Sequence, residues 1–150
     1  MKRFNFRLEK LLEVRSYEES KAEAELAKRS GAVALLEKSL MENAEASIRA
    51  GRERFRKGGG AQDYRAGERY ALRLAQERDR LMKALAQAEF ERDKARQLYV
   101  EASRAKELIG KLKERAETGY YKSAAREEMK LLDDMASIAK LRTTKQQRES

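Results

Sequence analysis

Few residues in this chain could carry out chemistry. Its densest carboxylate group is Glu127, Glu128, Asp133 and Asp134, residue types that can serve a metal ion or acid–base catalysis. The sequence has no His and no Cys, which excludes imidazole and thiolate ligands, thiol nucleophiles and disulfides. A hydroxyl nucleophile needs a base and an orienting group, and no such arrangement is recognisable. We therefore interpret the carboxylates as a solvated helix face. We expect no enzymatic activity, no metal and no cofactor.

Two further segments have residue types that could bind phosphate groups. The glycine run Gly58–Gly60 is not followed by the Lys-Ser or Lys-Thr pair of a phosphate-binding loop, so it predicts a turn instead. Just before it lies the densest basic patch, Arg49, Arg52, Arg54, Arg56 and Lys57. Nucleic acid could bind such a patch, but Glu53 interrupts it and no nucleic-acid-reading motif is present. We expect no nucleic-acid partner.

The composition of the 150 residues is typical of long helices rather than of a compact domain. Charged residues make up 41% of the chain, and there is no Pro and no Trp. Large apolar side chains are too scarce for one thick core, whereas Ala and Leu suffice for a thin seam between helices. No apolar run approaches the roughly 20 residues of a membrane span, and the first residues lack the apolar stretch of a secretory signal. We expect a soluble, cytoplasmic protein.

The elements that position these residues follow from the spacing of apolar and small side chains. They recur in alternating steps of four and three on both sides of the glycine run, as on one side of a helix. The stripe before the run includes Val33, Leu36 and Asn43, and the stripe after it includes Leu74, Leu85, Ala95 and Leu112. We predict helix 1 over about 6–56, a turn over about 57–63 with Asp63 as the N-cap, and helix 2 over about 64–141. Residues 1–142 would form a single helical hairpin, and 143–150 a flexible tail.

The predicted fold class is all-α, a long antiparallel two-helix coiled-coil hairpin. Folding back at the glycine run gives a register in which facing residue numbers sum to about 120, so that Leu36 lies near Leu85 and Leu8 near Leu112. Helix 2 is the longer one, and its carboxy-terminal part should extend beyond helix 1. Exposed tyrosines could either pack along the hairpin or dock a partner: Tyr64, Tyr70, Tyr120 and Tyr121.

Two stretches resemble a known family. Residues 4–15, Phe-Asn-Phe-Arg-Leu-Glu-Lys-Leu-Leu-Glu-Val-Arg, resemble the opening of the FliJ family of bacterial flagellar export proteins. Residues 108–136 resemble it again, through Leu-Ile-Gly-Lys-Leu-Lys-Glu-Arg, Tyr-Tyr-Lys, Arg-Glu-Glu-Met-Lys and Leu-Asp-Asp-Met-Ala. The length, the hairpin layout and the net charge of +9 agree over essentially the whole chain.

The resemblance implies a role in protein export. FliJ-like proteins are cytoplasmic parts of the flagellar type III export apparatus, and so serve flagellum biogenesis, motility and chemotaxis. They form an antiparallel coiled coil similar to the γ subunit of rotary ATPases. Their joined ends enter the homo-hexameric ring of the export ATPase FliI and promote its activity. The turn-proximal part contacts the cytoplasmic domain of the export gate FlhA, and the family also engages export chaperones. Membrane association would be indirect, through the gate at the cytoplasmic face of the inner membrane.

The resemblance also implies two contact surfaces. The surface facing the ATPase ring would comprise apolar residues of both termini: Phe4, Phe6, Leu8, Leu11, Leu12, Leu131, Leu132, Met135 and Ile138. The surface facing the export gate would comprise Tyr70, Leu74, Glu77 and Leu81, of which the last two differ in side-chain type from the family pattern. One alternative is the equivalent stalk of a virulence injectisome. Another is a basic coiled coil that binds nucleic acid, which would show strong, salt-sensitive retention on heparin.

Overall fold

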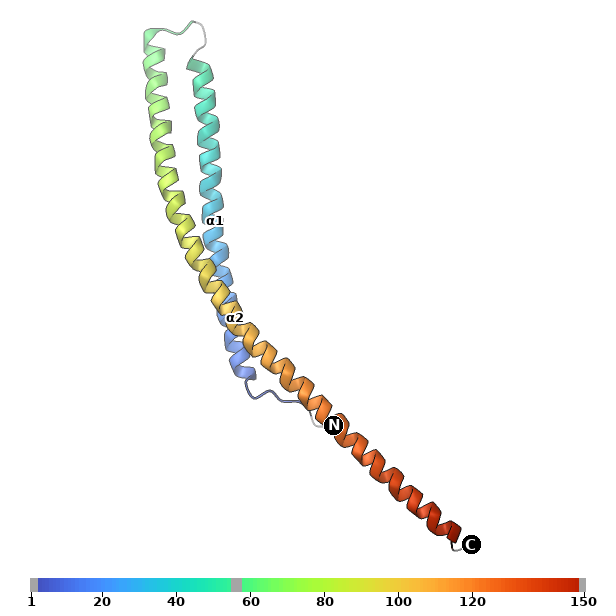
Figure 1. The fold of residues 1–150 in the computed structure, drawn as a ribbon. Helices are drawn as coiled ribbons and strands as arrows, with labels where there is room; N and C mark the ends of the chain where they lie inside the picture. Colours follow the sequence, from blue (N-terminus) through green and yellow to red (C-terminus); the bar gives the residue numbers. More distant parts are fainter. Residues whose placement is uncertain (1–2, 55–57, 149–150) are drawn as a thin grey trace. The chain divides into compact units, whose positions relative to one another are not determined.

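Two long helices make up almost all of the protein. The computed structural model describes residues 3–54 and 58–148. Within them α1 spans Glu9–Arg54 and α2 spans Ala61–Arg148, with no strand (Figure 1). The two helices pack against each other, which confirms the predicted all-α hairpin. Both helices run through two compact units, one of Met1–Ser16 with Arg104–Ser150 and the other of Tyr17–Ser103.

The unit Tyr17–Ser103 is held by a thin seam. Its buried apolar residues are Val33, Leu74 and Ala95, and the next layers, such as Leu36 and Leu85, are half-buried. All five belong to the stripes predicted from the spacing of apolar residues. A seam this narrow removes only a small share of each helix from water, so the hairpin depends on continuous contact along its length rather than on one deep core.

Direct contacts fix the antiparallel register of this unit. The side-chain amide of Asn43, which is 7% exposed, donates to the carbonyl oxygen of Leu74 at 3.1 Å. Nearer the turn, Arg54 on α1 forms an ion pair of 2.6 Å with Glu68 on α2. In both pairs the residue numbers sum to about 120, as the sequence predicted for a helical hairpin. No buried side-chain nitrogen or oxygen in the described part of the chain lacks a hydrogen-bond partner.

The turn ends earlier than predicted. Gly58 has a φ of 118°, a backbone conformation that glycine adopts readily and other residues rarely do. Then α2 begins at Ala61 rather than at residue 64. Gly60 occupies the N-cap position, and the Asp63 carboxylate accepts a hydrogen bond from the Gly60 N–H at 3.0 Å. Asp63 therefore lies in the first turn, where a carboxylate reaches back to the cap, and is not the N-cap itself. The predicted end of helix 1 at 56 lies outside the described residues.

The ends of the helices also differ from the predicted ones. Residues 3–8 precede α1, which begins at Glu9 rather than at residue 6. The Glu9 N–H donates a hydrogen bond to the carbonyl oxygen of Phe6, in the segment just before the helix. At the other end, α2 continues to Arg148, whereas the sequence suggested an end at 141 and a tail over 143–150. No Gly or Pro occurs in 143–148 to stop the helix.

Near the termini the seam moves by one residue. The sequence placed Leu112 in the stripe, but Leu112 is 46% exposed while Lys113 and Glu117 are half-buried. The Lys113 ammonium forms an ion pair of 2.8 Å with the Glu9 carboxylate across the two helices. A pattern of apolar types misses this layer because the long stem of a lysine can pack while its charge stays at the surface.

Candidate interaction surfaces

An aromatic cluster joins the amino-terminal segment to α2. The Phe4 ring packs on Tyr120 with the ring centroids 5.6 Å apart, and Tyr120 meets Tyr121 edge to face at the same separation. Geometries of this kind stabilise aromatic pairs beyond their burial. The cluster holds residues 3–8 against α2 although they are not helical. Sequence analysis flagged the two tyrosines but could not assign their partner.

Two open grooves flank this cluster. One has a volume of about 710 Å³ and lies between the amino-terminal segment and α2, lined by Arg3, Phe4, Asn5, Phe6, Glu9, Lys113, Glu117 and Tyr121. The other has a volume of about 380 Å³ and runs along α2 from Tyr120 and Tyr121 to Leu131. Of the residues predicted to face the ATPase ring, Phe4 and Phe6 line the first groove and Leu131 lines the second, while Tyr121 lines both.

The amino-terminal residues predicted to face the ring are only partly exposed. Phe4, Phe6 and Leu12 are half-buried, and Leu8 and Leu11 are at the edge of exposure. These side chains divide their surface between packing within the unit and solvent. They fit a supporting contact better than a primary anchor.

The carboxy-terminal residues predicted to face the ring are all exposed to solvent. Every residue from 125 to 142 is exposed, including Leu131, Leu132, Met135 and Ile138. Leu131, Met135 and Ile138 follow one another in steps of four and three, so they form one apolar strip along α2, and Leu132 lies beside it. Solvent-exposed apolar strips on a helix commonly mark interaction sites.

The four predicted gate-facing residues differ in how they are presented. Tyr70 is 42% exposed, and the Arg73 guanidinium lies 5.8 Å above its ring. Leu74 is 7% exposed and packs in the seam, while its carbonyl oxygen accepts the Asn43 amide. Glu77 is exposed and Leu81 is half-buried. In this arrangement Tyr70 is the side chain that a partner could contact, whereas Leu74 is occupied in the seam.

The surface chemistry is that of exposed ion pairs. Within residues 3–54 and 58–148 no three acidic side chains gather as a metal site would require, so Glu127, Glu128, Asp133 and Asp134 are not brought together as ligands. On α2 the Lys111 ammonium donates a hydrogen bond to Glu107 and attracts its charge, and both effects lower the pKa of that carboxyl. This pair favours the folded state above the ordinary pKa of a glutamate, and the effect is lost as the pH falls through the lowered one.

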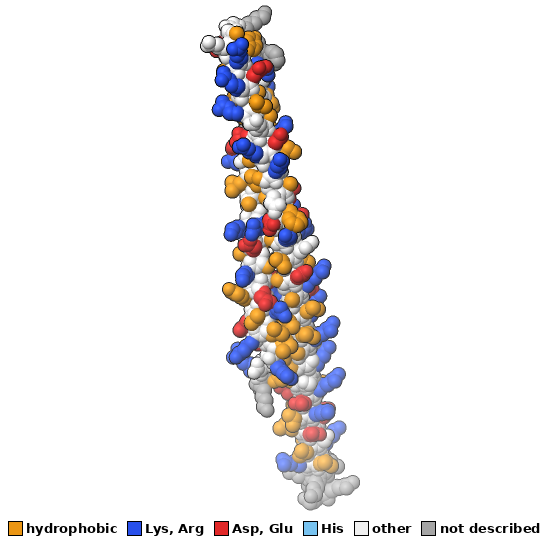
Figure 2. All heavy atoms as spheres, turned by 90° about the vertical axis from the view of Figure 1, so that its left-hand side faces the viewer, with side chains coloured by type: hydrophobic (Ala, Val, Ile, Leu, Met, Phe, Trp, Pro, Cys, Tyr) orange, Lys and Arg blue, Asp and Glu red, His pale blue; other side chains and the backbone are white. Residues whose placement is uncertain are grey.

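No helix in the described part of the chain combines the length and the apolar character that crossing a bilayer requires. Figure 2 shows hydrophobic side chains scattered among charged ones on the face that it displays. Such singly exposed apolar residues are normal on a protein surface. The strip on α2 stands out because its apolar residues share one face of an uncovered helix.

Two long helices that pack against each other along a thin seam, with an exposed apolar strip on α2, define a coiled-coil protein. Residues 4–145, nearly the whole chain, match the family described as Flagellar FliJ protein. The chain belongs to this family and is therefore a coiled-coil protein associated with flagellar export. Members of the family are non-catalytic components of the export apparatus. Comparisons with curated proteins and with solved structures find no match.

Proposed function

We propose that this protein is the stalk of the flagellar export ATPase, which it enters with its terminal unit and activates. The proposal rests on the exposed apolar strip of Leu131, Met135 and Ile138. Every residue of α2 from 125 to 142 is exposed, and the chain belongs to the FliJ family. The partner would be the hexameric ring of FliI. A ring lumen can cover a helix from all sides, which is how such a strip would leave water.

The same proposal assigns the turn-proximal unit to the export gate. Tyr70 would anchor the cytoplasmic domain of FlhA, with Glu77 and Leu81 beside it. Export chaperones would use the protein as a carrier at the cytoplasmic face of the inner membrane. These roles need surfaces rather than pockets, and exposed surfaces are what the two helices provide.

ATPase stimulation tests the proposal with a matched pair of variants. Met135 and Met129 are similarly exposed, at 68% and 70%, but Met129 lies outside the apolar strip, about 120° around α2 from Met135. Met135→Asp should raise the protein concentration needed for half-maximal stimulation by about tenfold or more, because it places a charge in a desolvated contact. Met129→Asp should change it less than about twofold.

A deletion provides a second test of the ring contact. Removing residues 125–150 should abolish stimulation, while circular dichroism should retain most of the helical signal because α1 and its partner segment of α2 remain. Full stimulation by the truncated protein, or equal losses in the two methionine variants, would show that the strip is not the ring contact.

A further inference from the structure

On one outer face of α2, all the charged side chains are basic. Between residues 69 and 83 this face presents, in steps of four and three, Arg69, Arg73, Gln76, Arg80 and Lys83. All five side chains are exposed. Helical periodicity puts them opposite the seam residues Leu74 and Leu81. We call this set the basic stripe.

Neighbouring carboxylates do not neutralise the basic stripe. The acidic residues of the same stretch lie on the flanks, and two of them are engaged elsewhere: Glu68 pairs with Arg54, and Asp79 with Arg78. The third, Glu77, lines a groove beside Arg73 and Arg80 but forms an ion pair with neither. In the described part of the chain, no ion pair involves Arg69, Arg73, Arg80 or Lys83. The outer faces of coiled coils usually mix both signs of charge, so a face of one sign requires another explanation.

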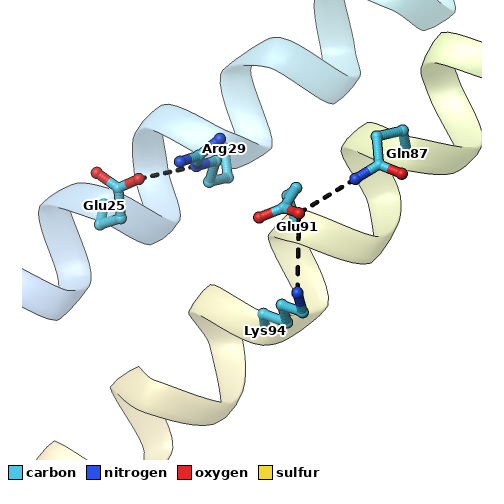
Figure 3. A network of polar contacts seen from close by, with 5 residues as sticks. All are labelled: Glu25, Arg29, Gln87, Glu91 and Lys94. Carbon is cyan, nitrogen blue, oxygen red and sulfur yellow. Dashed lines mark hydrogen bonds and ion pairs between the residues drawn. The ribbon is translucent and has the colours of Figure 1, made fainter.

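The stripe has a clear end. Beyond Lys83 the same face continues with Gln87 and Lys94, but both side chains contact the Glu91 carboxylate, at 3.1 and 3.9 Å (Figure 3). Lys94 also lies 4.3 Å above the Phe90 ring. Charge in this later segment is compensated within α2, whereas charge from Arg69 to Lys83 is not.

Apolar surface accompanies the uncompensated charge. Two open grooves run along this part of α2. One is lined by Ala66, Arg69, Leu72 and Arg73, and the other by Arg73, Gln76, Glu77, Arg80, Leu81 and Ala84. Each combines arginines with aliphatic side chains, of which Leu72 is well exposed. Arginines beside aliphatic side chains suit a partner that brings both carboxylates and apolar contacts.

We propose that the basic stripe binds an acidic amphipathic helix of a protein partner. Carboxylates spaced by four and three residues on such a helix repeat at the same interval as the arginines, and each can receive two hydrogen bonds from a guanidinium. Duplex DNA is a poorer fit. It carries a charge every ~1.7 Å, whereas the stripe offers four charges over about 21 Å. The groove beside Arg80 shares Glu77 and Leu81 with the proposed gate contact, but binding of the acidic helix does not depend on the gate or on the ring.

A fluorescence-anisotropy titration with a designed peptide tests this inference. The probe is a labelled helical peptide of about 20 residues with Glu at four–three spacing on one face and Ala and Leu beside it. The stripe variant combines Arg69→Gln, Arg73→Gln, Arg80→Gln and Lys83→Gln. The control variant makes the same charge change on exposed residues of α1, by Lys21→Gln, Lys28→Gln, Lys38→Gln and Arg49→Gln.

The stripe variant should bind the peptide at least about tenfold more weakly than the wild type, and the control variant less than about threefold. Arg80→Glu alone should weaken binding by at least about threefold, which keeps the test valid if the quadruple variant melts at a lower temperature. Three results would overturn the proposal: equal losses in the stripe and control variants, equal binding of a scrambled peptide, or tighter binding of a 20-base-pair DNA duplex in the same buffer.

Discussion

Asn43 shows how a single residue can align the two helices. It is a polar residue in a seam that otherwise consists largely of Leu, Ala and Val, and its amide meets the carbonyl oxygen of Leu74 at 3.1 Å. A buried Asn lowers stability compared with an apolar residue but favours the one register in which its hydrogen bond forms. The four–three spacing predicted that Asn43 belongs to the stripe. The carbonyl that it contacts could come only from the structure.

Asn43→Asp should destabilise the protein by about 2 kcal/mol at neutral pH, since a carboxylate would face the Leu74 carbonyl oxygen in place of a donor. Burial without a donor raises the pKa of such a carboxyl in the folded state. Stability should therefore recover at low pH, where the acid is protonated, and fall as the pH rises through the raised pKa. Thermal denaturation between pH 4 and 8 measures the change.

Gln97→Glu makes the same chemical exchange at an exposed position, and should cost little stability. A pH-independent loss in Asn43→Asp would contradict this account.

At the scale of the helices, the predictable part of the fold is the periodic part. Val33, Leu74 and Ala95 were all placed in the seam by four–three spacing, and all are buried. The ends were harder to predict, because they depend on specific contacts rather than on a period. Asp63 reaches back to Gly60, and Phe4 packs on Tyr120 although it precedes α1. The sequence identified Asp63 as a capping residue but placed it at the N-cap instead of in the first turn, and no local pattern signals the contact between Phe4 and Tyr120.

Gly58 in the turn and Gly31 in α1 lead to opposite expectations for the same substitution. Gly58 has a φ of 118°, so Gly58→Ala should destabilise the hairpin by about 1 kcal/mol. Gly31 lies inside α1 and an added Cβ would meet nothing within 4 Å, so Gly31→Ala should stabilise the protein by about 1 kcal/mol. Urea denaturation followed by circular dichroism measures both. Changes of the same sign would show that the backbone conformation of Gly58 does not limit stability.

For the whole molecule, the proposed contacts fall in different units. The apolar strip of Met135 belongs to the unit that contains both termini, while Tyr70 and the basic stripe belong to Tyr17–Ser103. The net charge of +9 could suggest a general affinity for anions, but which charges can bind a partner depends on where they lie. Paired charges, such as those of Lys111 and Glu107, add little, whereas the unpaired charges of the basic stripe are available to a partner.

Separate placement of the two sites predicts separable functions. Tyr70→Ala should weaken binding to the cytoplasmic domain of the export gate by roughly thirtyfold, the usual consequence of truncating an aromatic anchor worth about 2 kcal/mol. ATPase stimulation should be retained, because no ring-facing residue is changed. Met135→Asp should show the reverse, losing stimulation but retaining gate binding. Calorimetric titration with the gate domain and a steady-state ATPase assay measure the two properties on the same samples.

Tyr70 is 42% exposed, so its truncation should leave the melting temperature nearly unchanged. Gate binding that survives Tyr70→Ala would move the gate contact elsewhere. A sharp fall in melting temperature would show that Tyr70 holds the hairpin together instead.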